Sequence, residues 1–169
     1  MERNNVITFK GNPLTLVGPE LKVGDTAPDF TVCDGTLKPV KLSSFKGQTV
    51  ILSVTPSLDT PTCALQTKRF NQEASALNAK VLTISMDLPF AQSRFCESFS
   101  IKNILVLSDY KDREFGNKYG LLIKELALLS RAVLIVDKTG KIAYFQVVKE
   151  ITGEPDYKPV IEAAKKAGA

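Results

Sequence analysis

The three cysteines at positions 33, 63 and 96 are the residues best suited to chemistry in this 169-residue sequence, which contains no histidine. The absence of histidine excludes cysteine–histidine proteases, Ser-His-Asp hydrolases and HExxH zinc enzymes. Three cysteines without a CxxC pair also make a poor zinc site. No GxxxxGK[ST] or GxGxxG phosphate-binding motif occurs either. The cysteines are therefore expected to be structural or redox thiols.

Cys63 ends the segment TPSLDTPTC, residues 55–63, which follows an apolar run and enters a stretch with helical spacing. Thr60 is a favourable N-cap residue, and Pro61 suits the first helical position. Cys63 is therefore predicted to lie in the first turn of a helix. Backbone N–H groups there have no intrahelical partner, and the helix dipole favours an anion, so both stabilise a thiolate.

The helix alone is not enough to make Cys63 a ready nucleophile. Making most of an ordinary cysteine anionic at neutral pH requires roughly 3 kcal/mol, whereas a helix dipole contributes about 0.3–1 kcal/mol. A cationic neighbour is needed, and without histidine it must be an arginine or a lysine. The alternative is that Cys63 is only an apolar residue on a buried stripe with Phe70, Ala74 and Leu77. The local pattern leaves both interpretations open.

The central elements that must position Cys63 alternate between short apolar runs and helical patterns. Strands are predicted at residues 50–54, 80–86 and 104–107, and helices at residues 63–78, 90–99 and 113–119. Short apolar runs separated by helices indicate parallel strands that are covered on both faces.

Two antiparallel β-hairpins and a C-terminal helix are predicted outside this central region. Runs at 132–136 and 141–147 flank a turn signal at 137–140, and residues 6–10 and 14–17 flank a turn at 11–13. Residues 22–45 are predicted to be irregular with one or two short strands, and residues 157–167 to form an amphipathic helix. This order is that of an α/β, thioredoxin-like fold: a central mixed sheet flanked by helices, with an extra N-terminal β-hairpin.

Composition narrows the class of protein. The length fits a single domain, residues 1–169, and contents of 44% hydrophobic and 24% charged residues are typical of a soluble globular protein. The net charge of +4 comes from scattered lysines and arginines, which argues against nucleic-acid binding. We find no signal-peptide pattern and no apolar run of the roughly 18 residues that a membrane span needs. We therefore expect a cytoplasmic protein without membrane association, where structural disulfides are rare.

The segment around Cys63 also resembles a known family. Pro56, Thr60 and Cys63 match the PxxxTxxC motif of the peroxiredoxins. Four further stretches, at residues 9–13, 24–30, 91–96 and 130–132, resemble one subfamily, the atypical two-cysteine thiol peroxidases of bacteria. The resemblance covers nearly the whole chain.

The resemblance implies a role for each matched residue. Cys63 would attack a hydroperoxide, Thr60 would hydrogen-bond the peroxide oxygen, and Pro56 would shield the sulfur from water. Arg131 matches an arginine beside the thiolate and would be the required cation; the alternative is a surface charge at a strand edge, which its apolar neighbours weaken. Cys96 matches the resolving cysteine, which closes an intramolecular disulfide with Cys63; without the resemblance it would be read as a helix-face residue.

The implied reaction needs partners but no metal or organic cofactor. The partners are a hydroperoxide and a thioredoxin-type reductant, and members of the family usually form homodimers. Cys63 and Cys96 are predicted on separate helices, and a disulfide requires Cα atoms within about 7 Å. We therefore expect one or both segments to unwind during turnover. Cys33 is expected to be a structural thiol, the alternative being an auxiliary redox partner.

Two other functions are compatible with such a fold. One is a dithiol oxidoreductase of the thioredoxin kind, which the missing CxxC disfavours. The other is a binding or scaffold protein, since a fold does not determine a function.

Overall fold

A seven-stranded mixed sheet forms the centre of the molecule in the computed structural model, which describes residues 1–169. The strand order is β10-β9-β5-β6-β7-β3-β4, with parallel pairing from β5 to β7 and antiparallel pairing elsewhere. The strands are β3 (Thr31–Cys33), β4 (Pro39–Lys41), β5 (Val50–Val54), β6 (Lys80–Ser85), β7 (Leu105–Ser108), β9 (Ala132–Val136) and β10 (Ile142–Val147). All residues of β5 and β9 are buried, which explains why both are apolar except for Ser53 in β5.

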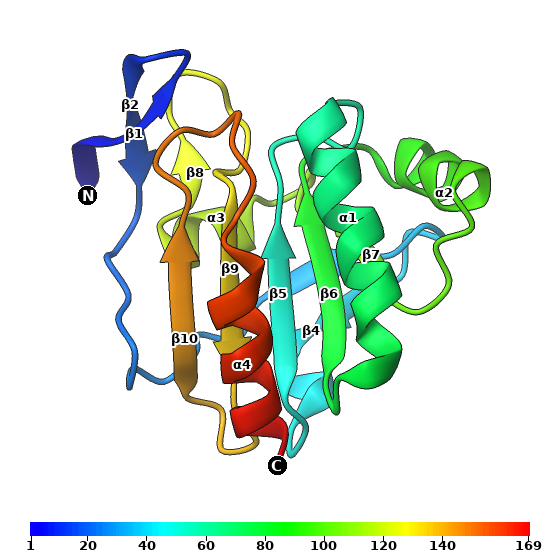
Figure 1. The fold of residues 1–169 in the computed structure, drawn as a ribbon. Helices are drawn as coiled ribbons and strands as arrows, with labels where there is room; N and C mark the ends of the chain where they lie inside the picture. The colour runs from blue at the N-terminus through cyan, green and yellow to red at the C-terminus, as the bar shows by residue number, and fades with distance from the viewer.

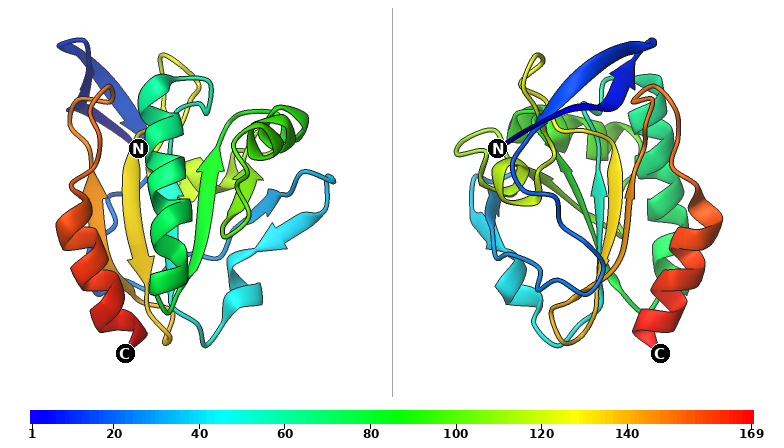
Figure 2. Two further views of the ribbon diagram at one scale, coloured as in Figure 1. Left: turned by 45° about the vertical axis from the view of Figure 1, so that its right-hand side comes forward. Right: turned by 90° about the vertical axis from the view of Figure 1, so that its left-hand side faces the viewer.

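The helices cover the sheet in layers. Helices α1 (Pro61–Glu73) and α4 (Tyr157–Gly168) lie on one face, in front of the sheet in Figure 1. Helix α3 (Glu114–Tyr119) lies on the opposite face, as the side view in Figure 2 shows. Helix α2 (Pro89–Ser98) lies at the β7 side of the molecule. None of these helices combines the length and the apolar character that crossing a membrane demands.

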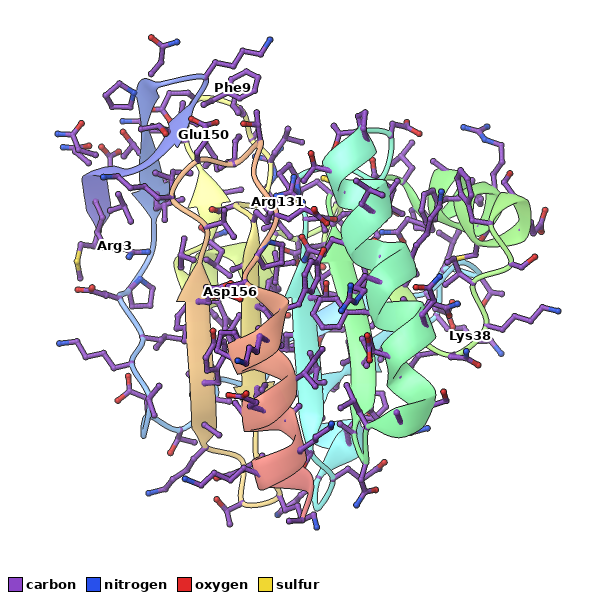
Figure 3. All side chains as sticks on the ribbon, viewed as in Figure 1. Arg3, Phe9, Lys38, Arg131, Glu150 and Asp156 are labelled. Atoms are coloured by element: carbon purple, nitrogen blue, oxygen red, sulfur yellow. The ribbon has the colours of Figure 1, made fainter.

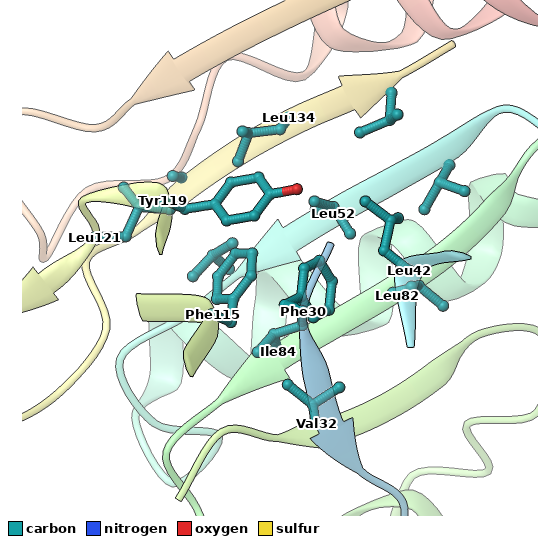
Figure 4. Packing of buried hydrophobic residues seen from close by; sticks show 14 of the residues in the cluster. Phe30, Val32, Leu42, Leu52, Leu82, Ile84, Phe115, Tyr119, Leu121 and Leu134 are labelled. Atoms are coloured by element: carbon teal, nitrogen blue, oxygen red, sulfur yellow. The ribbon is translucent and has the colours of Figure 1, made fainter. Parts of the chain in front are cut away.

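Side chains of β5 alternate between two cores because successive residues of a strand point to opposite faces. Leu52 belongs to the core on the α3 side, where the aromatic rings of Phe30, Phe115 and Tyr119 meet (Figure 4). The ring centroids of Phe30 and Phe115 are 4.9 Å apart in an edge-to-face arrangement. Ile51 belongs to the second core, beneath α1 and α4. Burial on both faces fixes the end of β5, from which the chain enters α1.

The N-terminal hairpin is present, but its turn differs from the predicted one. Strands β1 (Glu2–Phe9) and β2 (Asn12–Val17) pair with each other, and β2 also pairs with the two-residue strand β8 (Leu122–Ile123), which was not predicted. Phe9 pairs with Asn12, so only Lys10 and Gly11, both with positive φ, remain in the turn. The predicted turn at residues 11–13 was therefore wrong by one to two residues.

The other predicted boundaries agree with the structure to within two residues, apart from the start of the first strand, predicted at residue 6 although β1 begins at Glu2, and the helix predicted at residues 63–78. That helix begins at Pro61, and its α-helical part ends at Glu73. The chain tightens into a 3₁₀ turn, η2 (Ala74–Ala76), in which the Leu77 amide donates to the Ala74 carbonyl. A second 3₁₀ turn, η1 (Leu42–Phe45), precedes β5. The order of elements confirms the predicted thioredoxin-like fold with an N-terminal hairpin.

Candidate active site

Cys63 lies in the first turn of α1, where the local sequence places it. Thr60 is the N-cap, and its Oγ1 accepts a hydrogen bond from the Cys63 amide at 3.4 Å, while Pro61 occupies the first helical position. The Cys63 side chain is buried, with no exposed surface. The thiol is thus held beside the positive end of a 13-residue helix, in a place from which water is excluded.

Arg131 brings the positive charge to this thiol. The residue precedes β9, and its side chain is only 2% exposed. Its Nη2 lies 3.2 Å from Cys63 Sγ. Figure 3 shows Arg131 at the end of the sheet where α1 begins. The interpretation of Arg131 as a surface charge is therefore wrong.

The guanidinium of Arg131 has no carboxylate partner. Nε donates to the Ile151 carbonyl and Nη1 donates to Gln66 Oε1, both at 2.9 Å. The three ion pairs of the molecule all involve other residues on its surface. A buried cation is costly unless an anion compensates it. Of its three hydrogen-bonded partners, only Cys63 offers a nucleophilic atom, and the guanidinium therefore places its charge beside that sulfur.

Gln66 is a site residue that the sequence interpretation missed. It is fully buried, and its Nε2 donates to Ser53 Oγ at 2.8 Å while its Oε1 accepts from Arg131. The amide is thereby fixed between β5 and the guanidinium. A signal was available, because Gln66 follows Cys63 by three residues and lies on the same helix face, where a polar side chain needs a buried partner.

Thr60 and Pro56 both lie in the loop between β5 and α1. The Thr60 hydroxyl donates to the Ser57 carbonyl at 3.1 Å and accepts from the Cys63 amide. Its hydrogen is therefore already engaged in a bond within the protein. Thr60 is exposed, whereas Pro56 is buried. The hydroxyl would have to turn away from Ser57 to donate to a substrate.

Asp87 holds this loop from the end of β6 and was not singled out in the sequence. Its carboxylate accepts hydrogen bonds from Ser57 Oγ at 2.7 Å, from the Leu58 amide at 2.8 Å and from Ser85 Oγ at 2.6 Å. The loop that leads from β5 into α1 is thus held in place by the end of the neighbouring strand β6.

Cys96 lies on α2, away from this cluster, as the predicted separation on two helices requires. Its side chain is half-buried and packs against the core beneath α1 and α4. Burial, and then the charge of Glu97, raise the pKa of the Cys96 thiol, which is therefore protonated at neutral pH. No thiol of the chain forms a disulfide, so the structure describes the fully reduced protein.

Cys33 belongs to neither helix. It ends β3, and its Sγ lies 3.7 Å from the Ser108 carbonyl, to which it donates. Burial, followed by the charge of Asp34, raises the pKa of the Cys33 thiol. The charge of Lys111 acts in the opposite direction but does not outweigh these effects, so the surroundings of Cys33 disfavour a reactive thiolate.

Known proteins are similar to this chain over almost its whole length. The sequence profile of the redoxin family matches residues 22–161. Thiol peroxidases of Oceanobacillus iheyensis and Bacillus subtilis are 51% and 52% identical to it, over 95% and 94% of this chain and 98% and 96% of theirs. A peroxiredoxin-like protein from Aquifex aeolicus superimposes with a TM-score of 0.91 at 47% identity, covering 98% of this chain and 97% of its own.

Proposed function

The chain belongs to the thiol peroxidases of the redoxin family, enzymes that reduce peroxides, and we propose that Cys63 is the residue that attacks the peroxide. The observation that carries this assignment is the 3.2 Å contact between Cys63 Sγ and the buried Arg131 guanidinium at the start of α1. Neither Cys33 nor Cys96 has a cationic side chain in hydrogen-bond contact.

In the proposed first step, the Cys63 thiolate attacks the terminal oxygen of a hydroperoxide in line with the O–O bond. A sulfur–oxygen bond forms, the O–O bond breaks, and the leaving oxygen takes a proton and departs as an alcohol or water. The sulfur is oxidised by two electrons to a sulfenic acid. Arg131, Thr60 and the first-turn amides hold both oxygens and stabilise the developing negative charge, while Pro56 shields the sulfur from water.

In the proposed second step, the Cys96 thiol attacks the sulfur of the sulfenic acid. An intramolecular disulfide forms and water is released. Because the two cysteines lie on different helices, the first turn of α1, part of α2, or both must unwind to bring the sulfurs together. A thioredoxin-type dithiol then reduces the disulfide by exchange. We further propose that the protein works in the cytoplasm as a homodimer and accepts alkyl hydroperoxides as well as hydrogen peroxide.

Two substitutions separate these steps. Cys63→Ser is expected to abolish peroxide consumption, whereas Cys96→Ser should consume one equivalent of peroxide and then stop, without thioredoxin-linked turnover. Dimedone labelling followed by mass spectrometry should locate the sulfenic acid at Cys63 in the Cys96→Ser protein. Peroxide reduction by Cys63→Ser, or thioredoxin-linked cycling by Cys96→Ser at the wild-type rate, would contradict the assignment.

A further inference from the structure

Glu150 joins the N-terminal hairpin to the loop between β10 and α4. Its carboxylate accepts hydrogen bonds from Thr8 Oγ1 at 2.7 Å, from the Lys10 amide at 3.0 Å, from the Gly11 amide at 3.1 Å and from Thr152 Oγ1 at 2.9 Å. These hydrogen bonds, of which that from Thr8 has the largest effect, lower the pKa of Glu150 to about 2. The carboxylate is therefore ionised at neutral pH. The donors include both turn residues of the hairpin.

The backbone of the same loop pairs with the end of β1. The Thr8 amide donates to the Lys149 carbonyl at 2.7 Å, and the Ile151 amide donates to the Thr8 carbonyl at 3.0 Å. The Ile151 side chain is buried in the small apolar core of the hairpin. Residue 150 thus lies between two residues whose backbones hydrogen-bond to Thr8, and its side chain adds further hydrogen bonds to the hairpin.

This loop is also the support of Arg131. The Ile151 carbonyl accepts from Arg131 Nε at 2.9 Å, and the Val148 amide donates to the Arg131 carbonyl at 2.9 Å. At the far side of the loop, Thr62 Oγ1 donates to the Thr152 carbonyl at 3.0 Å, which ties the loop to the first turn of α1. A guanidinium is planar, so the bonds from Nε and Nη1 decide where Nη2 points.

We propose that Glu150 is a positioning residue: by fixing the loop of residues 148–152 to the hairpin turn, it sets the Ile151 carbonyl that aims Arg131 Nη2 at Cys63. The inference rests on the proposed function, in which Arg131 and Cys63 are the reacting pair. Figure 3 shows Glu150 and Arg131 at the same end of the molecule, with Phe9 of the hairpin beside Glu150. Glu150 does not itself touch Cys63.

A matched control exists in Glu125. Its carboxylate accepts from the Thr15 amide at 3.0 and 3.1 Å, so it also holds the hairpin, but it contacts no group that binds Arg131. Glu125→Ala should therefore reproduce any general loosening of the hairpin without altering the aim of Arg131.

The test is a double-mutant cycle on the rate constant of the first peroxide turnover, measured by stopped flow. Glu150→Ala is expected to lower this rate constant by about tenfold, since small misplacements of catalytic groups have large effects. Glu125→Ala should change it by less than about twofold. In an Arg131→Lys background, Glu150→Ala should have almost no further effect, because the group that it positions is gone.

The outcomes separate this inference from the proposed function. If Arg131→Lys is slow while Glu150→Ala reacts at the wild-type rate, Glu150 has no positioning role, although the proposed function stands. The inference also fails if Glu150→Ala slows both backgrounds equally. If Arg131→Lys reacts at the wild-type rate, the assignment of Arg131 itself fails. Thr8→Val removes one hydrogen-bond donor to Glu150 and keeps the Glu150 charge, so it should lower the rate constant in the same direction by a smaller factor. This variant replaces Glu150→Ala in the test if Glu150→Ala does not fold.

Discussion

Arg131 has the largest fully buried side chain of the molecule, and its contacts come from two separate segments of the chain. One contact comes from the helix that carries Cys63, one from Gln66 a turn further along that helix, and one from the backbone of the loop at Ile151. Position and charge are therefore both required of this residue. A lysine could supply only the charge, because its ammonium is a compact point charge without a planar fork.

Arg131→Lys is accordingly expected to lower the rate constant for peroxide reduction by roughly ten- to a hundredfold, as measured by stopped flow in a single turnover. The matched control is Arg69→Lys on the exposed side of α1, where the arginine pairs with Glu73 at the surface. That change should leave the rate unaltered, since exposed pairs contribute little. Equal rates for both variants would mean that charge alone suffices.

Helix α3 is an element whose stability depends on a buried acid. Asp109 is 2% exposed, and its carboxylate accepts from the Phe115 amide at 3.1 Å and from the Gly116 amide at 2.8 Å, in the first turn of α3. Burial nevertheless outweighs these hydrogen bonds and raises the pKa of Asp109 to about 6. The folded protein thus holds this proton to a higher pH than the unfolded chain, whose aspartates titrate near 3.9.

This difference predicts how the free energy of unfolding changes with pH. Between about pH 4 and pH 6 the unfolded chain loses the proton first, so the contribution of Asp109 to stability falls as pH rises and is constant above that range. The free energy of unfolding of Asp109→Asn minus that of wild type should therefore rise by roughly 1–3 kcal/mol from pH 4 to pH 7. Urea titrations at several pH values would measure it, with exposed Asp112→Asn as control. A difference independent of pH would contradict the prediction.

At the scale of the whole molecule, the proposed disulfide requires at least one of two helices, α1 and α2, to unwind in part. Helices α1 and α2 follow adjacent parallel strands, and both pack on the core that includes Phe70 and Phe95. The reduced form keeps Cys63 fully buried and Cys96 half-buried. The organisation of residues 1–169 as a single domain remains a prediction, and a single cooperative unfolding transition of the reduced protein would support it.

Oxidation with one equivalent of peroxide is therefore expected to increase amide hydrogen exchange in the first turn of α1, in α2, or in both, because the disulfide can close only from a partly unwound state. Hydrogen-exchange mass spectrometry of the reduced and oxidised protein would measure this, and the sheet strands should stay protected. Cys96→Ser treated in the same way provides the control without a disulfide. Unchanged exchange in both helices after disulfide formation would contradict the proposal.

The sequence by itself determined the features that depend on neighbours along the chain. Thr60, Pro61 and Cys63 define a helix start because capping involves residues within one turn of each other. The apolar runs of β5 and β9 predict buried strands for the same local reason. The family resemblance added Arg131 and Cys96, whose roles no local pattern specifies.

Only the tertiary structure decided how distant parts of the chain meet at Cys63. The bond from Arg131 spans 68 residues, and those from the hairpin to Glu150 span 139 to 142 residues. Strand β8 has two residues, too few for a periodic pattern. Backbone carbonyls such as that of Ile151 leave no mark in a sequence at all, because every residue carries one. Packing and strand pairing choose which carbonyl faces the guanidinium, and that choice completes the site.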